Sequence, residues 1–377
     1  MSAIAQVVKL ASIAGAPRAG QVVLGLARMH WRYFVFGRGR GLAKMLPMAT
    51  PMKIHVDPAS GCNFRCFFCP QTDPAALREA GVQFRSMGLP LFKKLIDDLA
   101  AFPSRVDELV LGNYGEPLLN KNIAEMVAYA KRSGRVREVS LITNASMLDA
   151  RTADKLAAAG LDKMRVSIEA MSDETYLKTT KTPQKFAEIV ENIRNFRDAA
   201  RRHGSKTFIY AKIIDTGLPD ADKRKFFETF LPISSAASIE NLMAVTPESA
   251  EVVGDDAKGM TGVSLSVERK VCPSPFYSLS IHANGDAGVC CSDWHHKTVV
   301  GSIARQSLKD IWDGDDLRDF RMAHLEKSWR GVDACSGCEI VKHYPVYEDL
   351  DAKTDELKRL LAQPKMLGSA EPALASA

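Results

Sequence analysis

The stretch Gly61-Cys62-Asn63-Phe64-Arg65-Cys66-Phe67-Phe68-Cys69-Pro70 contains three cysteines in a CxxxCxxC spacing. Three thiolates so close together can each bind one corner of a cubane iron–sulfur cluster. The fourth iron then has no protein ligand, so it can bind and reduce a small molecule. The spacing therefore predicts a reactive cluster rather than a closed structural metal site.

Zinc is the alternative occupant of these thiols. Cys66 and Cys69, joined to Cys335 and Cys338, would form a four-thiolate tetrahedron, although Cys62 would then have no role. Most of the eight cysteines in this 377-residue chain stand in close groups. Such grouping is typical of metal binding in a reducing compartment, not of a disulfide framework. We therefore predict a cytoplasmic metalloprotein.

Strand and helix patterns alternate along the chain from Pro51 onward. The expected strands are 53–57, 108–111, 139–143, 164–169, 207–215 and 239–245. The expected helices between and after them are 90–99, 120–131, 150–159, 186–203 and 221–230. Six such units predict an α/β fold with a parallel sheet, and six are too few for a closed eight-unit barrel. We expect an open, partial (β/α)6 TIM-like barrel.

Polar residues alternate with apolar ones in the expected strands. Arg165, Ser167 and Glu169 share one face of the fourth strand, and Tyr210 and Lys212 share a face of the fifth. A parallel strand covered on both faces would be almost entirely apolar. The polar face therefore indicates a barrel interior that holds a ligand, with a buried network among these side chains as the alternative.

Further motifs follow the expected strands in order. They are Asn113-Tyr114-Gly115-Glu116-Pro117, Thr143-Asn144, and the pair Ser167 and Glu169. Together with the cysteine loop, these motifs resemble those of the radical S-adenosylmethionine (SAM) superfamily, over about residues 51–245. Tyr114 and Ala145 stand where the family has glycines.

The resemblance implies roles for individual residues. Cys62, Cys66 and Cys69 would bind a [4Fe–4S] cluster whose unique iron carries SAM. The backbone of Phe68 would contact the adenine of SAM, and the Gly115-Glu116 element would hold its methionine amino group. Thr143-Asn144 would correspond to the family's Thr-Asn-Gly element. Ser167 and Glu169 would bind the ribose and methionine parts.

The C-terminal part contains a second group of cysteines. Cys272, Cys290, Cys335 and Cys338 resemble the shortened "twitch" form of the SPASM domain, which carries an auxiliary [4Fe–4S] cluster. A zinc ribbon is the alternative, because four thiolates also suit zinc. A hairpin (277–281 and 287–291, turning at Asn284-Gly285) and helices at 307–312 and 317–327 are expected here.

Cys291 lies outside this ligand set. It is an idle thiol, an alternative ligand in place of Cys290, or a hydrogen-atom donor to a substrate radical. Cys290 is preferred as ligand because it stands at a Gly-x4-Cys spacing from Gly285.

The resemblance also implies a reaction. SAM is reductively cleaved to a 5′-deoxyadenosyl radical, which abstracts a hydrogen atom from a polar substrate. The leading hypothesis is dehydrogenation of a sugar or cyclitol, with the auxiliary cluster as electron acceptor, as in twitch-containing dehydrogenases. Candidate bases for the departing proton are Tyr210, Lys212, His55 and Asp293. The alternatives are a radical epimerase or peptide-modifying enzyme, and a zinc-stabilised binding protein without catalysis. A flavodoxin- or ferredoxin-type protein would donate the electron.

Charge is distributed unevenly. The net charge is +5, but residues 1–56 contain eight Lys or Arg and no Asp or Glu, so the remainder is acidic. No nucleic-acid partner is expected. Residues 1–50 are a helical extension, a membrane-surface helix or a transit-like leader. The predicted domains are this extension, a radical SAM core at 51–245, an auxiliary cluster domain at 246–345, and a helix with a disordered tail at 346–377.

Overall fold

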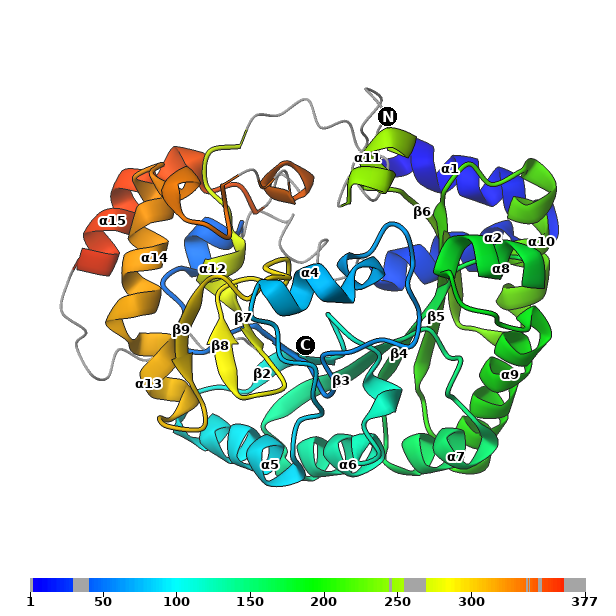
Figure 1. The fold of residues 1–377 in the computed structure, drawn as a ribbon, viewed down its shortest axis with the longest axis horizontal. Coiled ribbons are helices and arrows are strands. Elements are labelled where there is room, and N and C mark those ends of the chain that lie inside the picture. Colours follow the sequence, from blue (N-terminus) through cyan, green and yellow to red (C-terminus); the bar gives the residue numbers. More distant parts are fainter. Residues whose placement is uncertain are drawn as a thin grey trace.

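The structure is a computed structural model that describes residues 3–29, 41–243, 246–253, 269–336, 338, 340–344 and 348–362. Within these ranges the strands form one nine-stranded sheet in the order β6-β5-β4-β3-β2-β1-β7-β8-β9. The first six strands are β1 (Lys53–Val56), β2 (Val106–Leu111), β3 (Val136–Thr143), β4 (Lys163–Ile168), β5 (Phe208–Asp215) and β6 (Ala236–Asn241). All neighbouring pairs among them are parallel. This confirms the expected open barrel of six β/α units (Figure 1).

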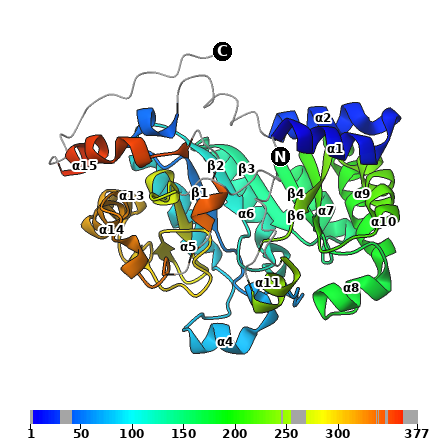
Figure 2. The same ribbon diagram turned by 90° about the horizontal axis from the view of Figure 1, so that it is seen from above.

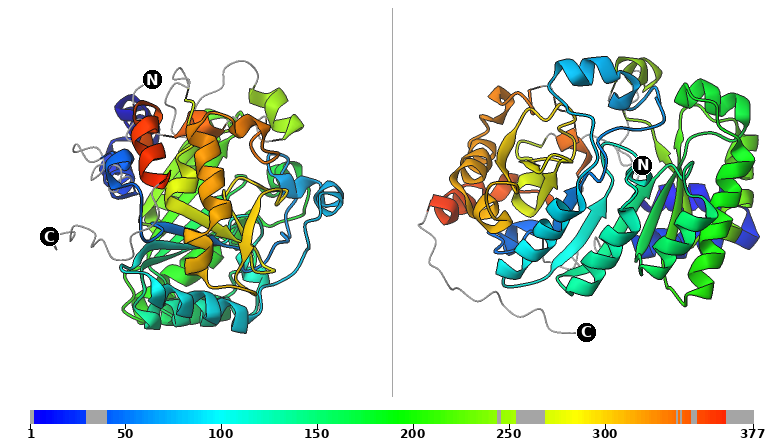
Figure 3. Two further views of the ribbon diagram at one scale, coloured as in Figure 1. Left: turned by 90° about the vertical axis from the view of Figure 1, so that its left-hand side faces the viewer. Right: turned by 60° about the horizontal axis from the view of Figure 1, so that its bottom comes forward.

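Helices cover the outer face of the curved sheet (Figures 1 and 3). They are α5 (Leu89–Asp98), α6 (Ile123–Ser133), α7 (Ala150–Ala158), α9 (Phe186–Arg202) and α10 (Asp220–Phe230). Each buries an apolar stripe, such as Ile189, Ile193 and Phe196 on α9. The inner face is polar as predicted, because β4 alternates buried Met164 and Val166 with half-buried polar residues.

Several observed elements differ from their expected bounds. Strands β2, β3 and β6 begin two or three residues earlier than the apolar pattern indicated, and the end of the expected strand 239–245 lies outside the described residues. Besides the short α12 (Ser274–Tyr277), three helices were not expected: α4 (Pro74–Glu79), α8 (Asp173–Thr180) and α11 (Pro247–Val253). All three lie on the side of the sheet toward which the parallel strands run (Figure 2).

Two N-terminal helices lie at the opposite side of the sheet (Figure 2). Helices α1 (Ala3–Ala14) and α2 (Ala16–Met29) pack on α10 and β6, with Val22 fully buried. Arg18 forms an ion pair with Glu228. Residues 3–29 therefore form a helical extension that covers the edge strand of the sheet. Across the described residues, every helix is too short or too polar to cross a bilayer.

The C-terminal part continues the same sheet. Strand β7 (Ser278–Ile281) pairs in parallel with β1, and β8 (Asp286–Gly288) and β9 (Val299–Ser302) follow it antiparallel. The expected hairpin is therefore present, and Gly285 has the positive φ of 92° that its tight turn requires. Helices α12 (Ser274–Tyr277), α13 (Leu308–Asp313), α14 (Asp315–Leu325) and α15 (Thr354–Ala362) surround it. Residues 363–377, including the expected disordered tail, lie outside the described residues.

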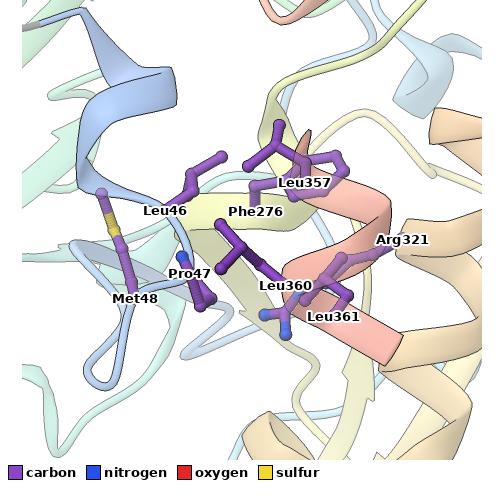
Figure 4. A pocket seen from close by; sticks show the side chains of 8 residues that line it. All are labelled: Leu46, Pro47, Met48, Phe276, Arg321, Leu357, Leu360 and Leu361. Atoms are coloured by element: carbon purple, nitrogen blue, oxygen red, sulfur yellow. The ribbon is translucent and has the colours of Figure 1, made fainter. Parts of the chain in front are cut away.

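A second apolar cluster joins residues 41–48 to α12, α14 and α15. Leu46, Phe276 and Leu357 line a small hollow at this junction, beside Arg321 (Figure 4). The hollow has a volume of about 10 Å³, which is room for about one water molecule. It is a packing joint between the N- and C-terminal segments and is too small to hold a substrate.

Candidate functional site

The three cysteines of the first loop follow β1 at the carboxyl edge of the sheet. Burial raises the pKa of Cys62 to about 12 and that of Cys69 to about 11. The pKa of Cys66 is also raised, first by burial and then by Glu169, Cys69 and Cys62. Three thiols that repel one another's charge in this way need a cation to become thiolates together. The donor set therefore fits an iron–sulfur cluster with one iron left free of the protein.

The loop is held from both sides by helices that the sequence did not predict. The N–H groups of Arg65 and Phe67 donate to the carbonyls of Thr180 and Thr179, at the end of α8. Thr246, next to α11, donates its hydroxyl to the Phe67 carbonyl at 2.7 Å. These bonds fix the loop before any metal binds, which lowers the conformational cost of cluster assembly.

Gly115 lies against the cysteine loop and has no room for a side chain. A Cβ at this position would come within 2.2 Å of the Ala59 carbonyl oxygen and 2.4 Å of the Gly61 carbonyl oxygen. The next residue, Glu116, donates its N–H to the Gly61 carbonyl at 2.9 Å. Close approach of the two backbones is therefore built into the motif, and it places the Gly115 segment beside the cluster ligands.

The Glu116 carboxylate links the ends of two strands. It accepts hydrogen bonds from the Leu118 N–H (3.0 Å), the Thr143 hydroxyl (2.7 Å) and the Asn144 N–H (2.8 Å). Burial raises the pKa of Glu116 to about 7. The bonds from Thr143 and Asn144 to Glu116 therefore hold the ends of β2 and β3 together. The side-chain amide of Asn144 also donates a hydrogen bond to Asn63 of the cysteine loop at 3.0 Å.

Glu169 lies at the end of β4 and carries a carboxylate oxygen, Oε2, that is buried without a hydrogen-bond partner among the described residues. Burial is the main cause of its raised pKa. Ser167 shares its face of the strand and is half-buried. Phe68 is partly buried and contacts Phe67 edge to face, with ring centroids 5.1 Å apart. An orphaned carboxylate beside three thiols fits a ligand with hydroxyl or ammonium donors, as SAM has.

Arg165 on β4 and Tyr210 on β5 both bond to Glu240 on β6, on the inner side of the sheet. Arg165 pairs with Glu240 at 2.8 Å, and Tyr210 donates its hydroxyl to the same carboxylate at 2.9 Å. Burial and Glu240 hold the pKa of Tyr210 well above its usual value. The structure therefore places Tyr210 in the wall rather than in the position of a base. Lys212 follows Tyr210 on the same face of β5, nearer the carboxyl end of the strand. It is buried and makes no hydrogen bond to a described residue.

The two remaining candidate bases differ in their hydrogen bonding. His55 is half-buried on β1, and burial lowers its pKa to about 3. Asp293 is buried, and its carboxylate accepts the N–H groups of Lys297 and Thr298. Asp293 therefore shapes the loop that follows Cys291, whereas Nδ1 of His55 is buried without a hydrogen-bond partner among the described residues.

The C-terminal cysteines lie near one another. Cys272, Cys335 and Cys338 lie close enough for each to affect the ionisation of another, and burial raises the pKa of Cys335 to about 12. Cys290 and Cys291 share a hydrogen bond, which raises the pKa of Cys290 and lowers that of Cys291 to about 7. This donor set fits a fully ligated auxiliary cluster, for which Cys290 and Cys291 are adjacent candidate ligands.

Two side chains of the Asn113–Pro117 motif donate hydrogen bonds to main-chain carbonyls of this second group of cysteines. Asn113 donates to the Cys291 carbonyl at 2.7 Å, and Tyr114 donates to the Cys290 carbonyl at 2.9 Å. Gln71, two residues after Cys69, donates to the Tyr114 carbonyl at 2.9 Å. A short chain of hydrogen bonds therefore runs from one cysteine group to the other. The sequence did not predict this link, because its partners are more than 170 positions apart in the chain.

Asp57, His282 and His296 cluster behind Tyr114. Asp57 accepts the Tyr114 N–H at 3.1 Å and lies 3.3 Å from Nδ1 of His282. The two imidazole rings are stacked, with centroids 3.5 Å apart and planes at 20°. Ring-nitrogen lone pairs lie in the ring planes, so in this stack they do not converge on one metal position. The cluster is best explained as packing that holds Tyr114 in place.

Comparison with known proteins identifies both parts of the chain. Residues 56–216 match the model of the radical SAM superfamily, and residues 272–339 match an iron–sulfur cluster-binding domain, SPASM. An AdoMet-dependent heme synthase of Methanosarcina barkeri is 23% identical over 332 residues, covering 78% of this chain and 90% of the relative. A dTDP-4-amino-4,6-dideoxy-D-glucose ammonia-lyase of Streptomyces venezuelae is 28% identical, covering 44% of this chain and 33% of that protein.

A solved structure shares the fold. SuiB of Streptococcus suis, bound to its precursor peptide SuiA, has a TM-score of 0.55 at 14% identity and covers 80% of this chain and 72% of its own. The match supports the arrangement of barrel and C-terminal part described above. From the domain matches and the site, the chain belongs to the radical SAM superfamily and is a radical SAM enzyme with a C-terminal SPASM domain, whose cofactors are SAM and [4Fe–4S] clusters.

Proposed function

We propose that this enzyme carries out a two-electron oxidation of a polar small molecule, such as a sugar or cyclitol alcohol. In this proposal Cys272, Cys290, Cys335 and Cys338 hold an auxiliary cluster that takes the second electron. The supporting observation is the direct hydrogen bonding of the Cys290–Cys291 loop to Asn113 and Tyr114, so that a cluster on these cysteines would lie next to the SAM motif. When bound, the cofactors supply hydrogen-atom abstraction and an electron sink.

The chain's own residues would orient the substrate and receive its proton. Lys212 is buried on β5, and Glu169, which is half-buried at the end of β4, has a buried oxygen without a partner among the described residues. We assign Lys212 to the substrate oxygen, where its side-chain amine acts as the base that receives the departing proton. Oxidation of the alcohol carbon removes one hydrogen atom, one proton and one further electron, so the three recipients account for the whole change.

The test is product analysis with anaerobically reconstituted enzyme. Protein, reductant and SAM are incubated with a panel of aminocyclitols and sugars, and each mixture is analysed for 5′-deoxyadenosine and for a product lighter by two hydrogens. The proposal expects one oxidised product per 5′-deoxyadenosine, and loss of that product in Cys272→Ser with SAM cleavage retained. Product of unchanged mass, with 5′-deoxyadenosine formed, contradicts oxidation.

Epimerisation or peptide modification is a second candidate, and one observation favours it. Cys291 lies beside the SAM motif, because Asn113 donates a hydrogen bond to its carbonyl at 2.7 Å. A thiol there is placed to return a hydrogen atom to a substrate radical. Reaction in heavy water distinguishes the two: deuterium in a product of otherwise unchanged composition, abolished in Cys291→Ala, indicates epimerisation.

We also propose a flavodoxin- or ferredoxin-type protein as the electron source for the first cluster. Reductive cleavage of each SAM requires one electron, and the two domains matched in the chain, radical SAM and SPASM, bind SAM and iron–sulfur clusters. Replacing dithionite with reduced flavodoxin, and measuring 5′-deoxyadenosine, checks this. Formation of 5′-deoxyadenosine with dithionite but none with flavodoxin or ferredoxin contradicts it.

A further inference from the structure

His324 lies near the end of α14 with its side chain turned inward and only 1% of the residue exposed. Its Nε2 is 3.8 Å from Sγ of Cys335, within hydrogen-bond range for a sulfur acceptor. Cys335 belongs to the ligand set proposed above for the auxiliary cluster. His324 was not among the candidate site residues, because a single histidine on an amphipathic helix carries no motif.

Two aromatic rings fix the plane of this imidazole. Trp329 is stacked on it at 5.4 Å between centroids and 11° between planes, and Phe320 lies 4.8 Å away. The indole N–H of Trp329 donates to the Lys270 carbonyl at 2.6 Å, two residues before Cys272. The imidazole is therefore held by groups that also belong to the auxiliary site, so its nitrogen keeps a fixed position toward Cys335.

The hydrogen bond has a defined direction. Nδ1 of His324 is buried without a partner among the described residues. An imidazole carries a hydrogen on at least one of its two ring nitrogens. A buried N–H without an acceptor is costly, so the hydrogen belongs on Nε2, where a sulfur acceptor is within reach. The ring therefore acts as a donor toward Cys335.

We propose that His324 is a redox-tuning residue: its Nε2–H donates to the Cys335 thiolate and raises the reduction potential of the auxiliary cluster. Hydrogen bonds to ligand sulfurs stabilise the more negative, reduced state of an iron–sulfur cluster and so make it a better electron acceptor. This inference rests on the proposed function, in which that cluster accepts an electron from the substrate. His324 acts through Cys335 and is a positioning residue, not a catalytic one.

The test is a redox titration monitored by electron paramagnetic resonance. Cys62, Cys66 and Cys69 are replaced by alanine in the full chain, so that only the auxiliary cluster contributes to the signal. His324→Phe keeps a ring between Phe320 and Trp329 but has no donor, and His324→Gln keeps an N–H. We expect a more negative midpoint potential in His324→Phe, and a value near the parent in His324→Gln. His203→Phe, at an exposed histidine beyond α9, is the control and should not change the potential.

Three outcomes contradict the inference in distinguishable ways. A parent protein that binds no iron overturns the proposed auxiliary site and this inference with it. A loaded cluster whose potential is the same in His324→Phe and the parent overturns the tuning role alone. A loaded cluster in His324→Gln with a midpoint potential well below the parent's, although this variant keeps an N–H, overturns the donor role even where His324→Phe loses its cluster.

Discussion

The phenol of Tyr114 donates a hydrogen bond to the main-chain carbonyl of Cys290, with 2.9 Å between the two oxygens. Tyr114 belongs to the SAM motif and Cys290 to the proposed auxiliary ligand set. The phenol is buried, and stacked histidines lie against its ring. A residue at a position that the family fills with glycine therefore connects the two halves of the enzyme.

Replacing Tyr114 with phenylalanine removes this donor and leaves the ring in place. The buried Cys290 carbonyl then lacks a partner, which costs about 1–3 kcal/mol. We expect the free energy of unfolding to fall by that amount in chemical denaturation. We also expect more 5′-deoxyadenosine per oxidised product, because the auxiliary loop is held less firmly. Tyr129→Phe is the control: its phenol donates to Asp97 at the surface, and a loss there as large as at Tyr114 would contradict the prediction.

Gly115 provides a sharper steric test. Gly115→Ala forces a Cβ to within 2.2 Å of the Ala59 carbonyl oxygen, so the motif and the cysteine loop must separate. We expect iron loading of the first cluster and SAM-dependent activity to fall at least tenfold. In the control, Gly88→Ala, the nearest atom to the new Cβ is the Pro90 Cδ at 3.8 Å, an ordinary contact. Iron analysis that finds equal loading in both variants would show that the close approach is not needed.

The buried carboxyl of Glu116 predicts a pH dependence of stability. Its pKa is raised from 4.5 to about 7, so the folded protein binds this proton more tightly than the unfolded chain. The stabilisation is complete below about pH 4.5 and is lost as the pH rises toward 7. We therefore expect the free energy of unfolding of the wild type to fall, relative to Glu116→Gln, between pH 5.5 and 7.5.

The pH comparison has an internal control in Glu125, an exposed acid on α6 that pairs with Lys93. Glu125→Gln should follow the wild-type pH profile. Parallel profiles of wild type and Glu116→Gln, measured by denaturant unfolding at each pH, would contradict the raised pKa.

Glu169 is predicted to bind SAM with the oxygen that lacks a protein partner. Hydrogen bonds to a charged group contribute about 1.5–3 kcal/mol, so Glu169→Gln should weaken SAM binding by about tenfold or more. Equilibrium binding of SAM to the reconstituted protein measures this. Glu174→Gln changes an exposed acid on the nearby α8 that pairs with Lys178, and it should bind SAM normally. Unchanged affinity in Glu169→Gln would remove the residue from the SAM site.

Local patterns were enough to predict the barrel and the cysteine groups. The strand–helix alternation follows from apolar periodicity, and the CxxxCxxC spacing is contained in eight residues. The polar inner face of β4 was also evident, because alternation places Arg165 and Glu169 on one side of the strand.

Long-range pairing was beyond such patterns. Nothing in the local sequence shows that β7 pairs with β1, or that Tyr114 bonds a residue 176 positions away. Helix α8 was missed because its threonine-rich sequence has little apolar periodicity, and the capping box of Ser172 and Thr175 starts it instead. Tyr210 was expected as a base because its face is polar. The structure shows why that face does not suffice: the phenol is already committed to Glu240.

The most direct measurement is the release of 5′-deoxyadenosine by anaerobically reconstituted protein supplied with reductant and SAM. The variant with Cys62, Cys66 and Cys69 all replaced by alanine is assayed alongside it. We predict 5′-deoxyadenosine from the intact protein and only background from the variant, because the three thiolates leave one iron open for SAM. Equal amounts from both proteins, or zinc in place of iron in the intact protein, would contradict the account.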